Sequence, residues 1–266
     1  MPIVVTGLSH HSSPVEMRER FAFSNTQVAD ALGQVRQRGI AEEAVILSTC
    51  NRVEIYAATR ESNPVLGQAL EQFLCDFHGV AAAPTHALYT HLEPQSVDHL
   101  FRVSCGIDSM VLGETEILGQ LKQAYRLAHA EKATAAQLNK TFQKAFNVAK
   151  LVRSETQIQR GSISVSSVAV ELAESIFDSL KSQQVLVIGA GDTSEKAARA
   201  LKSRGAQSIL VSNRSHDRAT ALAAELGGRA IGFDTWVEEF QRVDIIISST
   251  TAPHYMLTRD KLESLL

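Results

Sequence analysis

The first ninety residues alternate apolar runs, typical of buried strands, with amphipathic stretches of helical period. This pattern predicts six elements in the order βαββαβ. Strands are expected at 3–9, 44–49, 53–59 and 87–92, and helices at 25–38 and 64–77. The order is typical of a ferredoxin-like sheet with helices on one face, a scaffold that hosts many unrelated functions.

From residue 94 to about 180 the apolar positions recur at helical spacing. Four helices are expected, at 96–103, 116–130, 136–152 and 167–180. The segment 157–167 is poor in large apolar residues and contains Gly161 and several serines, which favours a flexible joint. The chain is therefore expected to form a first domain with a helical extension, residues 1–160, and a second domain, residues 161–266.

The second domain has a βαβαβ pattern that begins at residue 184. Strands are expected at 184–189, 208–214, 229–233 and 243–250, and helices within 189–205 and 217–226. Parallel strands joined by right-handed helical connections form half of a doubly wound, Rossmann-type sheet. Residues 261–266 resemble the start of a further helix, so this domain is expected to be incomplete at its C-terminus.

The turn after the first strand of this sheet is typical of a dinucleotide site. Such a turn must let backbone N–H groups and a helix N-terminus approach a pyrophosphate, and Gly189 and Gly191 allow that approach. Ser194 replaces the usual third glycine, but a strand precedes the turn and a helix follows it. Thr193 and Ser194 can donate hydroxyls, and Asp192 could instead cap the helix. The whole turn is expected to bind the cofactor: Gly189, Ala190, Gly191, Asp192, Thr193 and Ser194.

The second strand of the same sheet ends in Asn213, Arg214 and Ser215. NAD-selective folds carry an acidic residue here, which binds the ribose hydroxyls. Its absence favours NADPH, because Arg214 can pair with a 2′-phosphate in bidentate fashion, helped by Asn213 and Ser215. The alternative is a solvated surface arginine.

Composition excludes several classes of protein. A formal charge of −3 over 266 residues, with 44% hydrophobic and 21% charged residues, argues against nonspecific nucleic-acid binding through clustered cations. No apolar run has the ~18 residues that a membrane helix needs, and the N-terminus lacks a signal-peptide pattern, so a cytoplasmic protein is expected. Three cysteines fit neither a disulfide framework nor a zinc ribbon, so no metal is expected.

Cys50 is the candidate nucleophile. It lies between a buried strand and a returning strand, where a thiol is accessible. Arg52, two residues away, and the backbone amides of the turn could lower the thiol pKa from its usual value of about 8.5 and raise the thiolate fraction. Cys75 and Cys105 lack such neighbours and are expected to be packing residues.

Four motifs, in matching order, resemble those of glutamyl-tRNA reductase. They are SHHSSPVEMRERFAF at 9–23, LSTCNRVEIY at 47–56, DSMVLGETEILGQLKQA at 108–124 and GAGDTS at 189–194. The resemblance implies that Cys50 attacks the ester of glutamyl-tRNA(Glu) and forms a thioester. NADPH then reduces this thioester to glutamate-1-semialdehyde, in the first step toward 5-aminolevulinate and tetrapyrroles.

The resemblance also implies the residues that hold the glutamyl group. Arg52 is expected to clamp the γ-carboxylate, and acidic and polar groups near a helix start to face the α-ammonium. The expected substrate-binding residues are Thr49, Asn51, Arg52, Ser109, Glu114, Thr115, Glu116 and Gln120. Glu114 and Glu116 could instead complement a helix N-terminus. By the same resemblance, His99 is a candidate general acid or base near Cys50, and Arg18 is expected to be structural.

The family resemblance extends to partners. Glutamate-1-semialdehyde aminomutase is an expected partner, no membrane is expected, and intact family members are homodimers through a C-terminal region absent from this chain. The chain itself is therefore expected to be a monomer, or a dimer through a contact that the family does not use. One rival interpretation is another NADP-dependent oxidoreductase related to shikimate dehydrogenase, which would not need Cys50. A noncatalytic NADP-binding or tRNA-binding adaptor is the other, and the LSTCNR motif counts against it.

Overall fold

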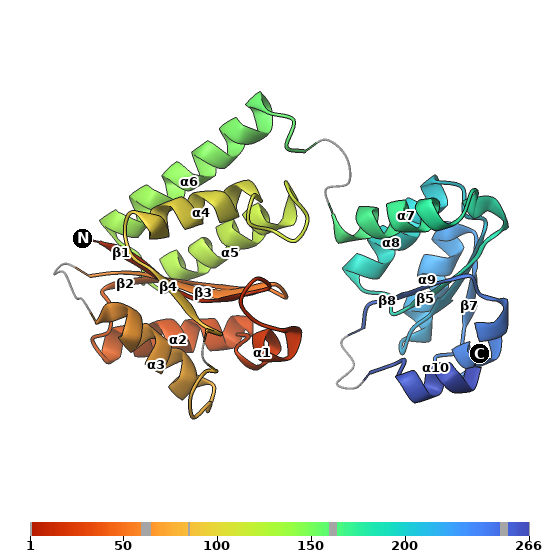
Figure 1. Cartoon of the computed structure of the whole chain (residues 1–266), viewed down its shortest axis with the longest axis horizontal. Coiled ribbons are helices and arrows are strands. Elements are labelled where there is room, and N and C mark those ends of the chain that lie inside the picture. The colour runs from red at the N-terminus through yellow and green to blue at the C-terminus, as the bar shows by residue number, and fades with distance from the viewer. Residues whose placement is uncertain (1, 60–64, 85, 160–163, 251–254, 266) are drawn as a thin grey trace. The chain divides into compact units, whose positions relative to one another are not determined.

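The computed structural model describes residues 2–59, 65–84, 86–159, 164–250 and 255–265. The chain divides into two compact units, Met1–Ile163 and Ser164–Leu266 (Figure 1). The expected joint at residues 160 and 161 lies outside the described residues. Among the residues that are described, no helix is both long and apolar enough to cross a membrane.

The first unit contains a four-stranded antiparallel sheet. Its strands are β1 (Ile3–Ser9), β2 (Glu43–Ser48), β3 (Arg52–Ala58) and β4 (Tyr89–His91), in the order β2-β3-β1-β4. This confirms the ferredoxin-like prediction. Ser9 at the end of β1 pairs with Arg52 at the start of β3, so the segment after β1 lies beside the turn that carries Cys50.

Helices cover both faces of this sheet (Figure 1). On one face lie α2 (Asn25–Gln37) and α3 (Leu66–Phe77); on the other lie α4 (Gln95–Cys105), α5 (Glu116–Ala130) and α6 (Ala136–Glu155). Every residue of β1 and β3 is buried as a result. Burial on both faces explains why these strands read as continuous apolar runs without alternation.

The short helix α1 (Val15–Arg20) was not expected from the sequence. It buries none of its residues, so it carries no apolar periodicity. The loop before it is fixed by the hydroxyls of Ser12 and Ser13, which both donate to the carbonyl of Ala87 at 3.0 and 2.9 Å. The loop before α1 is therefore held against the segment that leads into β4.

The buried carboxylate of Glu43 on β2 caps helix α6. It accepts hydrogen bonds from the backbone N–H groups of Ala135, Gln137 and Leu138, at 2.8 to 3.1 Å. These are donors that a helix leaves unpaired at its start, and a negative charge there is favourable. The cap therefore ties the helical extension to the sheet.

The second unit contains a four-stranded parallel sheet in the order β7-β6-β5-β8. Its strands are β5 (Gln184–Ile188), β6 (Ser208–Ser212), β7 (Arg229–Ile231) and β8 (Ile245–Ser248). Its helices are α7 (Val165–Ile176), α8 (Asp192–Ser203), α9 (His216–Leu226) and α10 (Arg259–Leu265), with 3-10 turns η1 (Leu180–Ser182) and η2 (Trp236–Arg242). The doubly wound prediction is confirmed. β8 pairs with β5 on the side opposite β6, so the strand order reverses direction between β5 and β8. Doubly wound folds bind their ligands at this point of reversal.

Candidate active site

The β2–β3 turn presents Cys50 at its tip. Thr49 N–H donates to the carbonyl of Arg52 at 2.8 Å, and the Thr49 hydroxyl accepts from the N–H groups of Asn51 and Arg52, each at 3.1 Å. From the neighbouring segment, His10 N–H donates to the carbonyl of Asn51 at 2.9 Å. The backbone on both sides of Cys50 is thus fixed, while its side chain is exposed.

The other two cysteines are buried, as expected. Cys75 is 6% exposed and Cys105 is 2% exposed. Burial is the largest influence on the Cys105 thiol and raises its pKa, which keeps it protonated. Cys50 is thus the accessible thiol.

The prediction that Arg52 lowers the pKa of the Cys50 thiol is wrong. Arg52 begins β3 and its side chain is only 1% exposed, donating from Nη1 to Glu54 at 2.8 Å and from Nη2 to both the carbonyl and the carboxylate of Asp108. The pKa of Cys50 is raised, mainly by partial burial of the thiol and also by Glu114 and Glu116. Its own backbone N–H lowers the pKa by a hydrogen bond, and the cation that lowers it is Arg18. Closeness in sequence did not bring the guanidinium to the sulfur.

Glu54 is the centre of a buried hydrogen-bond cluster. Its carboxylate accepts from Arg52, from the hydroxyls of Tyr56 and Tyr89, and lies 2.8 Å from Nε2 of His99. Burial alone would raise its pKa, but Arg52 and His99 outweigh burial and hold the pKa well below its usual range. Burial and the Glu54 charge together raise the pKa of both tyrosines, so these remain neutral donors.

His99 belongs to this cluster. Its ring packs against those of Tyr89 and His91, with centroids 5.6 and 5.1 Å away, while Nε2 faces Glu54. These contacts fix its orientation through a carboxylate, a common arrangement for histidines that transfer protons. A role for His99 at Cys50 stays a prediction.

The connection between α4 and α5, with the first residue of α5, brings two of the expected substrate-binding residues toward Cys50. Glu114 and Glu116 lie close enough to raise the thiol pKa, and the Glu114 carbonyl accepts from Arg153 at 3.1 Å. Ser109 follows Asp108, which binds Arg52, and its hydroxyl is buried without a hydrogen-bond partner among the described residues. A buried hydroxyl without a partner is costly, and a polar ligand would satisfy it.

Gln120 lies one helical turn after Glu116 on α5. It lines a groove with Ser48 of β2 and Phe23, on a mainly apolar floor. Thr115 is exposed at the start of α5, and Asn51 is half-buried in the Cys50 turn. Glu114 and Glu116 make the surroundings of Cys50 acidic on the side of α5. A negative charge there suits a cationic group such as an ammonium.

In the second unit, a hollow of about 220 Å³ opens at the β5–α8 turn. Gly189 has φ +96°, and a Cβ there would lie 2.4 Å from the Ser249 carbonyl oxygen, so only glycine fits. At Gly191, nothing lies within 4 Å of where a Cβ would stand. This open space lets a phosphate reach the start of α8, so the residues of the turn fit a dinucleotide.

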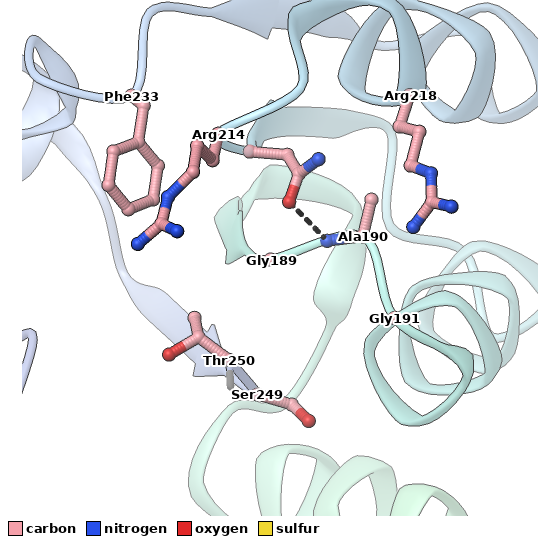
Figure 2. A pocket seen from close by; sticks show the side chains of 9 residues that line it. Gly189, Ala190, Gly191, Arg214, Arg218, Phe233, Ser249 and Thr250 are labelled. Atoms are coloured by element: carbon pink, nitrogen blue, oxygen red, sulfur yellow. Dashed lines mark hydrogen bonds between the residues drawn. The ribbon is translucent and has the colours of Figure 1, made fainter. Parts of the chain in front are cut away.

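Two arginines flank this hollow, from the loop after β6 and from α9 (Figure 2). Figure 2 shows the Arg214 guanidinium beside the ring of Phe233, and Arg218 on the far side of the Ala190 turn. Arg218, Phe233, Ser249 and Thr250 were not expected from the sequence. Arg218 could have been predicted from its spacing: it lies four residues after Arg214, and a helix starts between them.

Two residues expected to contact the cofactor also hold the turn together, and the alternative role of Asp192 as a helix cap is wrong; cofactor contacts from all three stay predictions. The Ser194 side chain is fully buried and its hydroxyl lies 3.4 Å from the carbonyl of Ser249, so it joins the turn to the end of β8. Asn213 accepts from Ala190 N–H at 3.2 Å and donates to the Ser215 carbonyl at 3.0 Å, so its amide fixes the turn. Asp192 is not the helix cap, because Gly191 occupies that position.

Asp192, Thr193 and Ser215 are exposed, whereas Ala190 is buried. Asp192 forms an ion pair with Lys196 at 2.6 Å, and the carbonyl of Thr193 accepts from the Ser166 hydroxyl of α7. Ser215 precedes α9 and its side chain does not cap the helix. Cofactor contacts from Thr193 and Ser215 stay predictions.

Family models match both units. The model of the glutamyl-tRNA(Glu) reductase N-terminal domain matches residues 6–156, and that of shikimate/quinate 5-dehydrogenase matches residues 171–266. No metal-binding group of three or more His, Cys, Asp or Glu side chains occurs in the described part of the chain.

Relatives match along nearly the whole chain. The glutamyl-tRNA reductase of Akkermansia muciniphila is 45% identical over 98% of this chain and 77% of its own length. That of Pelotomaculum thermopropionicum is 44% identical over 100% of this chain and 60% of its own. The solved glutamyl-tRNA reductase from Methanopyrus kandleri is 36% identical, with a TM-score of 0.57, over 99% of this chain and 62% of that one. The chain thus spans about three fifths of the length of two of these three relatives.

Proposed function

Because the chain belongs to the glutamyl-tRNA reductase family, we propose that it reduces the glutamyl group of glutamyl-tRNA(Glu) to glutamate-1-semialdehyde with NADPH. The observation that carries this proposal is the exposed Cys50 thiol on a turn whose backbone is fixed on both sides. A nucleophile needs an accessible side chain in a defined position.

The reaction has two steps at Cys50. In the first, the thiolate attacks the ester carbonyl carbon, the carbon–sulfur bond forms and the ester carbon–oxygen bond breaks. The ribose oxygen leaves as a hydroxyl by taking up one proton, which balances the proton that the thiol lost. In the second, a hydride adds to the thioester carbonyl carbon and the carbon–sulfur bond breaks, which yields the aldehyde and returns the thiolate. NADPH, when bound, supplies that hydride.

The glutamyl group carries an ammonium and a γ-carboxylate. Glu114 and Glu116 supply the negative charge that the ammonium needs, and Ser109 offers a buried hydroxyl. Thr49, Asn51, Thr115 and Gln120 complete the proposed pocket. Arg52 can clamp the γ-carboxylate only by exchanging a bond to Glu54 or Asp108, because its side chain is buried against both.

Recognition of NADPH rests on the hollow at the β5–α8 turn. The open space at Gly191 receives the pyrophosphate at the start of α8, and Arg214 and Arg218 bind the 2′-phosphate. Two guanidinium groups give a doubly charged phosphate more than one bidentate partner. The described residues that line the hollow include no carboxylate to bind free ribose hydroxyls, which favours NADPH over NADH.

The test is mass spectrometry of the chain after mixing with glutamyl-tRNA in the absence of NADPH. A glutamyl adduct on the peptide that contains Cys50 is expected, and Cys50→Ser is the matched control that should carry none. Adducts on Cys75 or Cys105, or turnover that survives Cys50→Ser, would instead favour a dehydrogenase that needs no nucleophilic thiol.

The same proposal extends to location and partners. The product is a reactive α-amino aldehyde, so direct transfer to an aminomutase that consumes it would limit its loss. Glutamate-1-semialdehyde aminomutase in the cytoplasm is the proposed partner. A monomer is proposed for this chain, and light scattering would report its mass.

A further inference from the structure

Arg18 lies against the nucleophile turn, although it is 32 residues from Cys50 in sequence. Its Nε donates to the carbonyl of Cys50 at 3.1 Å, and its Nη1 donates to the carbonyl of Ser13 at 2.6 Å. One guanidinium thus joins the turn to the loop that follows β1. Because guanidinium is planar, two donors in a fixed geometry hold both carbonyls at once.

The segment that carries Arg18 is itself fixed. Ser12 and Ser13 hydroxyls donate to the carbonyl of Ala87, and Arg18 N–H donates to the carbonyl of Pro14 at 3.2 Å. The Cys50 turn is therefore held at the Asn51 carbonyl by His10 and at the Cys50 carbonyl by Arg18. Cys50 as a residue stays exposed although both contacts hold its turn.

The charges around the thiol give Arg18 a second effect. Glu114 and Glu116 approach from the start of α5 and favour the protonated thiol, as burial does, while Arg18 approaches from α1 and favours the thiolate. Arg52 faces Glu54 and Asp108 instead. The positive charge near the nucleophile therefore comes from a residue that the sequence alone marks as structural.

We propose that Arg18 is a positioning residue for Cys50, which fixes the nucleophile turn through its carbonyl and stabilises the thiolate by its charge. The inference rests on the proposed function only for the identity of the acyl donor. The state of the thiol can be measured without that donor.

Alkylation of the full chain by iodoacetamide measures the thiolate directly. The thiolate attacks the methylene carbon, a carbon–sulfur bond forms and iodide leaves, so the rate follows the thiolate fraction. Peptide mapping isolates the rate at Cys50, and its pH profile gives a midpoint and a plateau. This measurement needs neither tRNA nor NADPH, so its failure is distinguishable from failure of the proposed function.

Arg18→Gln and Arg18→Met remove the charge. Each is expected to move the midpoint of the profile to higher pH and to slow alkylation at neutral pH by roughly three- to tenfold, since a half-exposed charge acts more weakly than a buried one. Arg18→Lys should restore the midpoint, because it keeps the charge. Arg20→Gln, on the same helix and exposed, is the matched control and should leave the profile unchanged.

A midpoint unchanged in a folded Arg18→Gln or Arg18→Met variant would overturn the proposal. Failure of both variants to fold, seen as loss of the far-ultraviolet circular dichroism of the parent, would assign Arg18 to stability alone and would also overturn it. A shifted midpoint that Lys does not restore would contradict the role of the charge.

Discussion

At the scale of single residues, the buried Glu54 carboxylate organises the charges of the first unit. Donors from β3, β4 and α4 converge on it, and Arg52 is buried beside it. Removing one partner of a buried ion pair leaves the other charge uncompensated, which costs about 3–5 kcal/mol. Glu54→Gln should therefore lower the free energy of unfolding by about 3 kcal/mol near neutral pH.

This stabilisation depends on pH with a definite sign. The pKa of Glu54 is lower in the folded protein than its usual value of about 4.3, so its contribution is complete above that value and is lost as pH falls toward the folded pKa. Urea unfolding of parent and variant should show the largest difference at neutral pH and a smaller one in acid. Glu131→Gln, at an exposed turn, is the control. A difference that grows in acid would contradict this account.

Arg218 is the residue by which cofactor selectivity can be tested. Arg218→Ala should weaken NADPH binding roughly 10- to 100-fold, because a hydrogen bond to a charged group contributes about 1.5–3 kcal/mol, and should change NADH binding little. Fluorescence titration with each cofactor gives the two affinities. Arg204→Ala, which removes a surface pair with Glu174, is the control. Equal losses for both cofactors would remove Arg218 from the 2′-phosphate site.

At the scale of elements, the β5–α8 turn uses its two glycines for different purposes. Gly189→Ala places a Cβ 2.4 Å from the Ser249 carbonyl in a left-handed backbone, which should cost about 1–3 kcal/mol of stability. Gly191→Ala meets no atom within 4 Å at a negative φ, so stability should change by less than about 0.5 kcal/mol. Its methyl group would nevertheless occupy the space proposed for the pyrophosphate. Thermal unfolding and NADPH titration of both variants separate the effects, and normal NADPH affinity of Gly191→Ala would contradict the proposed site.

At the scale of the whole molecule, each unit has its own apolar core, and the single tryptophan, Trp236, lies in that of the second unit. It is 2% exposed and packs under Lys261, 4.5 Å from its ring centroid. Tryptophan fluorescence therefore reports unfolding of the second unit.

NADPH at 100 times its Kd should raise the free energy of unfolding of the second unit by about 2.7 kcal/mol, and NADH at the same concentration should raise it by less. Identical midpoints with and without NADPH would contradict binding to this unit.

The amino-acid sequence by itself determined the elements and both fold classes. The spacing of apolar residues along the chain reflects which side chains are buried. Strands covered on both faces and amphipathic helices could therefore be located within a few residues. The exceptions have a physical reason: α1 buries none of its residues, and η2 is a 3-10 turn, whose repeat of three residues differs from that of an α-helix. Cys50 at a strand end and the glycine turn at 189–191 were also evident, because each depends on local chain geometry.

Only the tertiary structure decided which side chains meet. Strand register and helix packing set those distances, and neither is encoded by spacing along the chain. Arg52, two residues from Cys50, faces Glu54, whereas Arg18, 32 residues away, binds the Cys50 carbonyl. Asn213 likewise binds the turn beside it, and Arg218 joins Arg214 at the cofactor hollow because α9 starts between them. The residue types of both candidate sites could be predicted from the sequence. The contacts of each side chain could not, because they depend on packing between segments far apart in the chain.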